Sequence, residues 1–390
     1  MRMLHTSDWH LGRQFGQVSL ADEHESFVAW MLDVVHQERI DLVVVAGDVY
    51  DRAIPPVESV TLLRQALTTL AGSGVRVVAI AGNHDSAERV AASDGLTDAA
   101  GIFIRGGYGR VGDVITLPFA DGPLDVVAVP YLDPLMAPPS TVGDGETAPD
   151  GAARRPTHQT VLRQALSHPR PLGASRSVAV AHAFVAGATE TDSERALTVG
   201  DTGRVATTTF DGFSYVALGR LHRPQVVGGD PTRRYCGSPL PFSFSETHAK
   251  EVVVVDLDAA GRATITSLPV PVGRPVATIT GGIDELLMHP RHTDVEQHFV
   301  RAVVTDSGPV LDAKARLLHR YPYVTEIVLP TPSGRRAGHD GDVVRARTAL
   351  APIDATTAFW GDVTGAEPTD VERRLLESLL AAALSDEAAR

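Results

Sequence analysis

The chain carries three short polar motifs: Asp8-Trp9-His10, Gly47-Asp48-Val49-Tyr50-Asp51 and Gly82-Asn83-His84-Asp85. Each motif follows a short apolar stretch that is typical of a buried strand. Together they place carboxylates, imidazoles and an amide oxygen at the ends of three successive strands. Oxygen and imidazole ligands of this kind suit Mn²⁺, Fe²⁺ or Zn²⁺. Two such ions that share a carboxylate form a centre able to hydrolyse phosphate esters.

The residues around these motifs alternate between strand and helix patterns. Leu42–Ala46 and Val75–Ile80 are Val-rich runs, as expected for strands that are buried on both faces. Apolar residues recur with helical spacing in Glu23–Val35 and Val57–Leu70. This alternation predicts βαβ units, in which ligands bind at the carboxyl ends of parallel strands. The motifs lie at those ends, so we expect an α/β domain built around a site.

Beyond this region the pattern becomes mostly β. The expected strands are Ile102–Arg105, Asp113–Leu117, Leu124–Pro130, Ser177–Ala181, Tyr215–Leu218, Glu251–Asp256 and Ala263–Leu268. The stretch Ala137–Pro156 is rich in Pro, Gly, Thr and Asp and has no periodicity, so we expect an exposed loop there.

The composition changes near Val270–Pro275, where a smaller α+β segment is expected to begin. Its elements would be strands Val276–Thr280, Phe299–Val304 and Val324–Leu329 with helices Ile283–Leu287 and Ala313–Arg320. Ser333–Gly341 has the composition of a linker, and the tail from Pro368 predicts an amphipathic helix. We therefore expect three parts, with boundaries at residues 1–270, 271–335 and 336–390.

Charge and cysteine content limit the classes of partner and compartment. The formal net charge of −13 argues against nucleic-acid binding by bulk electrostatics. A phosphodiester substrate remains compatible with it, because divalent cations reverse the local field at a metal site. The single Cys236 fits a reducing compartment, and no segment has the apolar length of a membrane span or a signal peptide. We therefore expect a cytoplasmic protein with no membrane partner.

Two later histidines extend the candidate site. His182 follows the apolar run Val178–Ala181, and His222 follows a run that ends in Gly219-Arg220-Leu221. One histidine at a strand end is more often structural than a ligand. A shared metal centre becomes the better explanation when several chemically suited residues follow strands of one domain, namely Asp8, His10, Asp48, Asn83, His84, His182 and His222.

These motifs resemble the calcineurin-like metallophosphoesterases, whose pattern is D-x-H, G-D-x-x-D, G-N-H-D, a later His, and G-H-x-H. Within that superfamily the chain is similar to the SbcD family of nuclease subunits from DNA-repair complexes. The stretches that carry this similarity are Leu4–Arg13, Ala46–Arg52, Phe184–Gly187, Tyr235–Leu240 and Phe242–Glu246. The resemblance implies a metallophosphoesterase β-sandwich flanked by helices, with an α+β capping domain and a C-terminal helical segment.

The resemblance also implies two Mn²⁺ ions. One would be held by Asp8, His10, Asp48 and His222, and the second by Asp48, Asn83 and His182. A carboxylate can bridge two ions because it has two oxygens, and an amide oxygen is a hard, neutral ligand. The two ions would activate a water and clamp the oxygens of an in-line displacement.

His84 matches the family's catalytic histidine rather than a metal ligand. By the resemblance it would stabilise the transition state or protonate the leaving oxygen. Asp85 would orient the His84 ring. We expect Asp51 to form hydrogen bonds within the site rather than to coordinate.

Arg220 departs from the family pattern, which has a histidine ligand of the second ion at this position. An arginine side chain offers only donors and cannot coordinate a cation. Three interpretations stay open. The second metal position is weakly occupied or filled by water, the Arg220 guanidinium contacts the scissile phosphate as a substrate-binding group, or the protein has little intrinsic nuclease activity.

The C-terminal third of the chain corresponds to two further parts of proteins in this family. Residues 275–335 fit a capping domain, and the tail fits a helical segment that binds an SbcC-type ABC ATPase. Phe359 and Trp360 would be interface anchors of this segment. The family also implies a homodimer within a heterotetramer, with Glu58–Leu70 or Ala87–Ala92 as candidate dimer surfaces.

Three functions remain in view from the sequence. The first is a metal-dependent DNA exonuclease and endonuclease that acts at DNA ends and hairpins with the ATPase, in DNA repair, recombination and replication. The second is a phosphodiesterase of small molecules, and the third is a catalytically weakened scaffold. The branch-specific motifs and the long C-terminal extension favour the first.

Overall fold

The computed structural model describes residues 1–138, 155–167, 175–194, 203–306, 308, 310–329, 353–354, 356–357, 360 and 367–388. The chain divides into two compact units. The first comprises Met1–Thr278, Val295–Arg301 and Tyr323–Thr325, and the second comprises Ile279–Asp294, Ala302–Pro322 and Glu326–Arg390. The three-part division expected from the sequence stays a prediction. The linker 333–341 and Phe359 lie outside the described residues.

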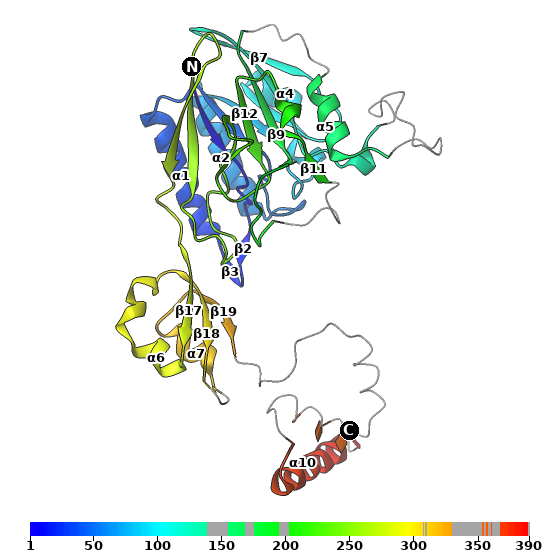
Figure 1. Ribbon diagram of the computed structural model, residues 1–390, viewed down its shortest axis with the longest axis vertical. Helices are drawn as coiled ribbons and strands as arrows, with labels where there is room; N and C mark the ends of the chain where they lie inside the picture. The colour runs from blue at the N-terminus through cyan, green and yellow to red at the C-terminus, as the bar shows by residue number, and fades with distance from the viewer. Residues whose placement is uncertain are drawn as a thin grey trace. The chain divides into compact units, whose positions relative to one another are not determined.

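The first unit contains two six-stranded mixed sheets (Figure 1). The first sheet has the order β16-β15-β1-β4-β5-β6, and four of its strands are parallel while β15 and β16 add an antiparallel edge. Its strands are β1 (Arg2–Thr6), β4 (Leu42–Val45), β5 (Arg76–Ile80), β6 (Ile102–Arg105), β15 (Glu251–Leu257) and β16 (Ala263–Pro269). Thr6 pairs with Val45, and Val45 with Ala79, so the parallel strands end side by side.

The second sheet has the order β13-β14-β12-β9-β8-β7. Its strands are β7 (Val114–Phe119), β8 (Gly122–Val129), β9 (Ser177–His182), β12 (Tyr215–Gly219), β13 (Gln225–Val227) and β14 (Asp230–Tyr235). The four strands β8, β9, β12 and β14 are parallel, with β7 and β13 antiparallel at the edges. Gly219 pairs with His182, which aligns the carboxyl ends of β12 and β9.

The two sheets pack face to face, with helices on their outer faces. In β4, Leu42 and Val44 belong to the core between the sheets, whereas Val43 and Val45 belong to the core under the helices α1 (Ala21–Gln37) and α2 (Val57–Gly72). Successive side chains of a strand point to opposite faces, so a strand buried on both faces must be apolar throughout. The α/β sandwich expected from the sequence is confirmed.

The outer face of the second sheet is covered by α5 (His158–Ser167), whose buried apolar residues Val161, Leu162 and Leu166 pack in one cluster with β8 and β9. The sequence analysis did not expect this helix. Shorter elements complete the unit: α3 (Ala87–Val90), α4 (Asp94–Ala99), β2 (Gln14–Phe15), β3 (Val18–Ser19), β10 (Phe184–Val185), β11 (Arg204–Val205), and 3₁₀ turns at Pro134–Met136 and Thr207–Phe210. The expected strands from Leu42 to Leu268 begin and end within two residues of the observed ones.

Gly219 allows the two sheets to approach each other beside the site. A Cβ atom at this position would lie 1.8 Å from the carbonyl oxygen of Ala46 and 3.0 Å from Nδ1 of His182. Backbone oxygen cannot yield by that amount, so a side chain here would force β12 away from the end of β4. The glycine therefore brings the strand ends of the two sheets together.

A three-stranded sheet follows, made of β17 (Val276–Gly281), β18 (Phe299–Val304) and β19 (Val324–Val328), with α6 (Ile283–Met288), a 3₁₀ turn at Pro290–Val295 and α7 (Ala313–Leu318). The α+β segment expected here is confirmed, and its role as a cap stays a prediction. The helix α10 (Asp370–Ala388) corresponds to the predicted amphipathic tail. Among helices of the described ranges, none has the length and apolar character needed to cross a membrane.

Candidate metal centre

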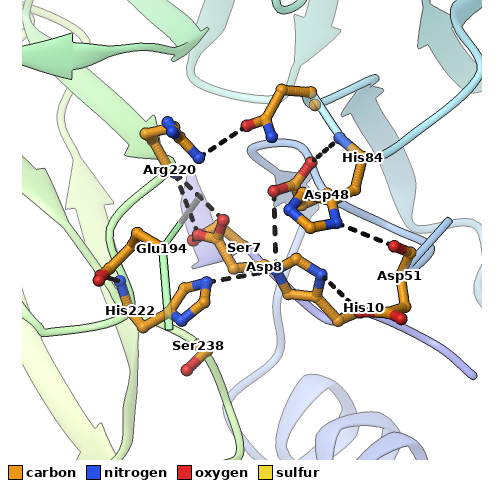
Figure 2. Close-up of polar contacts among 12 residues, drawn as sticks. Ser7, Asp8, His10, Asp48, Asp51, His84, Glu194, Arg220, His222 and Ser238 are labelled. Atoms are coloured by element: carbon orange, nitrogen blue, oxygen red, sulfur yellow. Dashed lines mark hydrogen bonds and ion pairs between the residues drawn. The ribbon is translucent and has the colours of Figure 1, made fainter. Parts of the chain in front are cut away.

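The predicted site residues come together where strands of both sheets end. The first sheet contributes the loops after β1, β4 and β5, and the second contributes the ends of β9 and β12. Figure 2 shows the part of this cluster that follows β1, β4, β5 and β12, in which Asp8, His10, Asp48, His84 and His222 lie close together. The whole cluster contains all seven predicted residues, namely Asp8, His10, Asp48, Asn83, His84, His182 and His222, as the contacts below show.

The loops that carry the ligands have an unusual backbone conformation. Asp8, His10 and Asp48 have φ angles of 51°, 47° and 47°, in the left-handed region that most residues avoid. Backbone hydrogen bonds hold them there, because the Asp8 N–H donates to the Gly47 carbonyl and the His10 N–H to the Asp48 carbonyl, both at 3.0 Å. Such strain concentrates at functional sites, where it aims side chains. Here it turns both carboxylates inward.

Two buried carboxylates form the middle of the cluster. Asp8 and Asp48 are exposed by 0% and 1%, and both offer oxygens to one group of ligand atoms that also includes His182. Burial raises the pKa of Asp8. Burial would also raise the pKa of Asp48, but the neighbouring His182 and the hydrogen bond from it hold that pKa well below its usual range. Asp48 is therefore an anion in the protein interior, and a buried anion is suited to bind a metal cation.

The rings of His182 and His84 share one orientation, with Nδ1 toward the protein backbone and Nε2 toward the centre. Nδ1 of His182 lies 2.9 Å from the Ala46 carbonyl oxygen, and Nδ1 of His84 lies 2.8 Å from the Asp51 carbonyl oxygen. A carbonyl oxygen only accepts, so each Nδ1 carries a ring proton and Nε2 is the nitrogen that each ring turns toward the centre. The Nε2 atoms of His182 and His84 therefore face the centre, where they can take part in metal binding or proton transfer.

His10 and His222 meet within the cluster. Their Nε2 atoms are 3.2 Å apart, and both rings are buried. Burial lowers the pKa of His10 to about 3, so this ring is neutral at physiological pH. Their nitrogens, together with an Asp8 oxygen, lie within 4.8 Å of one another. Two imidazoles and a carboxylate directed at one point fit a divalent transition-metal ion, and the residues present thus suit the expected cofactor class.

Arg220 contacts the predicted second metal position. Its guanidinium donates from Nη1 to Oδ1 of Asn83 at 2.9 Å, and the same oxygen lies 3.1 Å from Nε2 of His182. Its backbone, at a φ of 123°, donates N–H to both oxygens of Asp8 at 3.2 Å (Figure 2). The amide oxygen expected to bind the second ion is therefore engaged by a cation from the protein.

One expectation for Asp85 is wrong. Its carboxylate accepts backbone N–H groups of Gly82, Val49 and Tyr50 at 2.8–3.0 Å, and the ring of His84 is oriented instead by the Asp51 carbonyl. Burial, with the charge of Asp48, raises the pKa of Asp85 to about 7. Asp85 thus joins the second and third motif loops to each other. As expected, Asp51 forms hydrogen bonds, accepting from Arg13 at 3.1 Å.

The structure adds residues that the sequence analysis did not assign to the site. Glu194 accepts the backbone N–H of His222 at 2.7 Å, and Ser193 lies 2.6 Å from Nδ1 of the same ring. Behind Ser193 lies a buried ion pair of Glu246 with Lys250. The sequence pointed to one of these residues, Glu246, only because the stretch Phe242–Glu246 resembles the family, and it gave that residue no physical role.

Comparisons with known proteins agree with this geometry. The family model described as calcineurin-like phosphoesterase matches residues 1–132. The SbcD subunit of nuclease SbcCD from Escherichia coli K12 is 32% identical over 293 residues, which is 73% of this chain and 72% of the relative. The Bacillus subtilis protein of the same name is 36% identical over 286 residues, or 71% of each chain. A Staphylococcus saprophyticus relative of that name is 25% identical over 99% of each chain.

We predict that Mn²⁺ stabilises the folded protein. A ligand that binds only the native state at 100 times its Kd adds about 2.7 kcal/mol to the free energy of unfolding. Thermal unfolding should therefore occur several degrees higher in MnCl₂ than in EDTA. Asp48→Asn should lose this response, whereas Asp98→Asn, which removes a carboxylate paired with Arg105, should keep it. Equal melting temperatures of the wild-type protein with Mn²⁺ and with EDTA would contradict the metal centre.

Proposed function

Because the chain belongs to the SbcD family of nuclease subunits, and so is a metal-dependent phosphodiesterase, we propose that it cleaves DNA at ends and hairpins together with an SbcC-type ATPase. The observation that carries this proposal is the convergence of Asp8, His10 and His222 on one point, with an Asp48 oxygen 3.6 Å from Nε2 of the same His10 ring. The buried oxygen and imidazole donors support Mn²⁺ as the cofactor. The metal-bound form would supply an activated water and positive charge opposite the phosphate.

The protein's own side chains have separate roles in this proposal. Asp8, His10, Asp48 and His222 would hold the first ion, and Asp48, Asn83 and His182 would hold the second. His84 presents Nε2 to the site, with its Nδ1 proton held by the Asp51 carbonyl, so the doubly protonated ring is placed to pass its Nε2 proton to the leaving oxygen. Asp85 holds the His84 loop rather than the ring.

We predict that His84→Asn lowers DNA cleavage about 10²–10⁴-fold, the usual contribution of a general acid. The variant should bind Mn²⁺ as the wild type does, because the four ligands of the first ion are unchanged. The assay compares blunt duplex, hairpin and single-stranded circular DNA with a chromogenic phosphodiester, with and without ATPase and ATP. Asp48→Asn serves as the control that loses both cleavage and metal.

The alternatives give different results in this assay. Turnover of the chromogenic ester without DNA cleavage would favour a phosphodiesterase of small molecules. A wild-type protein that cleaves none of these substrates, even with the ATPase and ATP, would favour the scaffold. An unchanged rate in His84→Asn would contradict the catalytic role of that residue.

We propose that Arg220 leaves the second metal position weakly held. The support is the hydrogen bond that the Arg220 guanidinium donates to the Asn83 side-chain oxygen. A donor bound to this oxygen competes with a metal ion for the oxygen's lone pairs. The same guanidinium could instead turn to a phosphate oxygen of the substrate and replace part of the charge of the missing ion.

We predict that Arg220→His raises the Mn²⁺ content toward two ions per chain and increases turnover. Elemental analysis of the dialysed protein measures the first quantity, and cleavage of a duplex end measures the second. Arg220→Gln is the matched control, because it removes the charge without adding a ligand nitrogen. Equal Mn²⁺ content and equal rate in the native and histidine proteins would contradict the proposal.

The partner proposal depends on α10. Val371, Leu375 and Leu379 are 70%, 57% and 58% exposed and recur every four residues, so they form one apolar face of the helix. An exposed apolar face of this kind marks a protein-binding surface. We propose that it binds the ATPase. We also propose a homodimer within a heterotetramer and a cytoplasmic location.

We predict that Leu375→Glu combined with Leu379→Glu abolishes co-purification with the ATPase and leaves Mn²⁺ binding unchanged, because buried apolar anchors dominate such interfaces. Arg373→Glu, on the opposite side of the same helix, is the matched control and should bind the partner. Retained co-purification of the double variant would refute this use of α10.

A further inference from the structure

A chain of hydrogen bonds runs outward from one candidate metal ligand to a buried ion pair. Nδ1 of His222 lies 2.6 Å from Oγ of Ser193, and that hydroxyl donates to Oε1 of Glu246 at 2.5 Å. The other carboxylate oxygen of Glu246 accepts from Nζ of Lys250. Glu246 is 2% exposed and Lys250 is 8% exposed, so this chain lies inside the protein.

The direction of each hydrogen bond follows from the donor and acceptor capacity of the groups in the chain. An ammonium group only donates and a carboxylate only accepts, so the single Ser193 proton is committed to Glu246. The Ser193 oxygen can then only accept from the ring, which places the His222 proton on Nδ1. The Nε2 lone pair of His222 is thereby left facing the centre, 3.2 Å from Nε2 of His10.

The group that contacts Nδ1 of His222 differs from the group that contacts Nδ1 of His182. The Nδ1 of that ring meets the Ala46 carbonyl oxygen, which can never donate, so its tautomer is set by the backbone alone. A serine hydroxyl can point its proton either way. Without an acceptor behind it, Ser193 could donate to Nδ1 of His222, and the ring proton would move to Nε2, where it blocks metal binding.

We propose that Glu246 is a positioning residue that fixes the metal-binding tautomer of His222 through Ser193, and that Lys250 keeps the Glu246 carboxylate in the required orientation. The inference rests on the proposed function, because it takes His222 to be a ligand of the first ion. Outer partners of metal-bound histidines commonly change metal affinity 10–100-fold. In this chain the partner acts through an intervening hydroxyl.

Other contacts of the ion pair support this assignment. Nζ of Lys250 also donates to Oγ of Ser238 at 2.9 Å and lies 3.3 Å from the His222 carbonyl oxygen. Glu246 accepts the backbone N–H of Phe242 at 3.2 Å. These contacts bind the pair to the segment that carries His222 and hold both charged groups in place. A buried pair satisfied in this way has little freedom to reorient.

The substitution Glu246→Gln tests the relay because an amide has one acceptor and one donor end. The buried ammonium of Lys250 holds the amide oxygen at the Oε2 position, so the amide NH₂ takes the Oε1 position that faces Ser193, where the Phe242 N–H loses its acceptor. The hydroxyl then turns its proton toward His222 and selects the Nε2–H tautomer. We expect Mn²⁺ affinity, measured by calorimetry, to fall about 10–100-fold. In metal-free protein with ¹⁵N-labelled histidine, NMR should show the His222 proton moving from Nδ1 to Nε2.

Two further variants sharpen the test. Adding Lys250→Met to Glu246→Gln frees the amide to turn its oxygen to Ser193, so the Nδ1–H tautomer and most of the lost affinity should return. Ser193→Ala removes the relay without disturbing the ion pair and should give a smaller loss of affinity with a mixed tautomer. This variant decides the question if Glu246→Gln does not fold. Asp98→Asn, which breaks the pair with Arg105, controls for lost stability.

The outcomes separate this inference from the proposed function. If His222→Gln binds Mn²⁺ as the wild type does, His222 is not a ligand and the proposed metal set fails. If His222→Gln weakens binding but Glu246→Gln and Ser193→Ala keep native affinity and an Nδ1–H ring, only the relay is wrong. If the double variant binds as weakly as Glu246→Gln, the orienting role of Lys250 is wrong.

Discussion

Two carboxylates of like charge, Asp8 and Asp48, are buried side by side, and the rest of the site follows from that constraint. Anions in a protein interior need donors or cations around them. Asp8 accepts from Ser7 and from the backbone of Arg220, and Asp48 accepts from the backbone of His84. The oxygens left facing the centre call for a divalent cation. The strained loops and inward imidazoles are arranged around that requirement.

The sandwich supplies what neither sheet could supply alone. The first sheet brings both carboxylates and His10, because its parallel strands end side by side. The second brings His182 and His222 from β9 and from the loop after β12. Gly219 lets these edges meet, since any side chain there would collide with the Ala46 carbonyl. The metal centre is therefore a property of the packing between two sheets.

Two residues that are not candidate ligands contact the candidate ligands of this site. The guanidinium of Arg220 donates to the Asn83 oxygen, and by our proposal this contact weakens the second metal position. Glu246 contacts His222 through the Ser193 hydroxyl, and by our inference this contact sets which nitrogen of His222 carries the proton. Under the two proposals, metal affinity at both positions is governed partly by residues that do not coordinate.

The local sequence was sufficient to predict most strands of the two sheets and seven residues that folding brings together, because continuous apolar runs and a polar residue directly after a strand are local patterns. The sandwich itself was predicted from the family resemblance. It did not predict α5, whose apolar face has meaning only against the second sheet. It also misassigned Asp85, because the partners of a loop carboxylate depend on where neighbouring loops lie. Ser193 is distant in the chain from both His222 and the Glu246–Lys250 pair, and only folding places these groups in one line. The sequence alone determined which residue types could bind a metal ion. The direction of the hydrogen bonds between these residues was decided by tertiary contacts between distant segments.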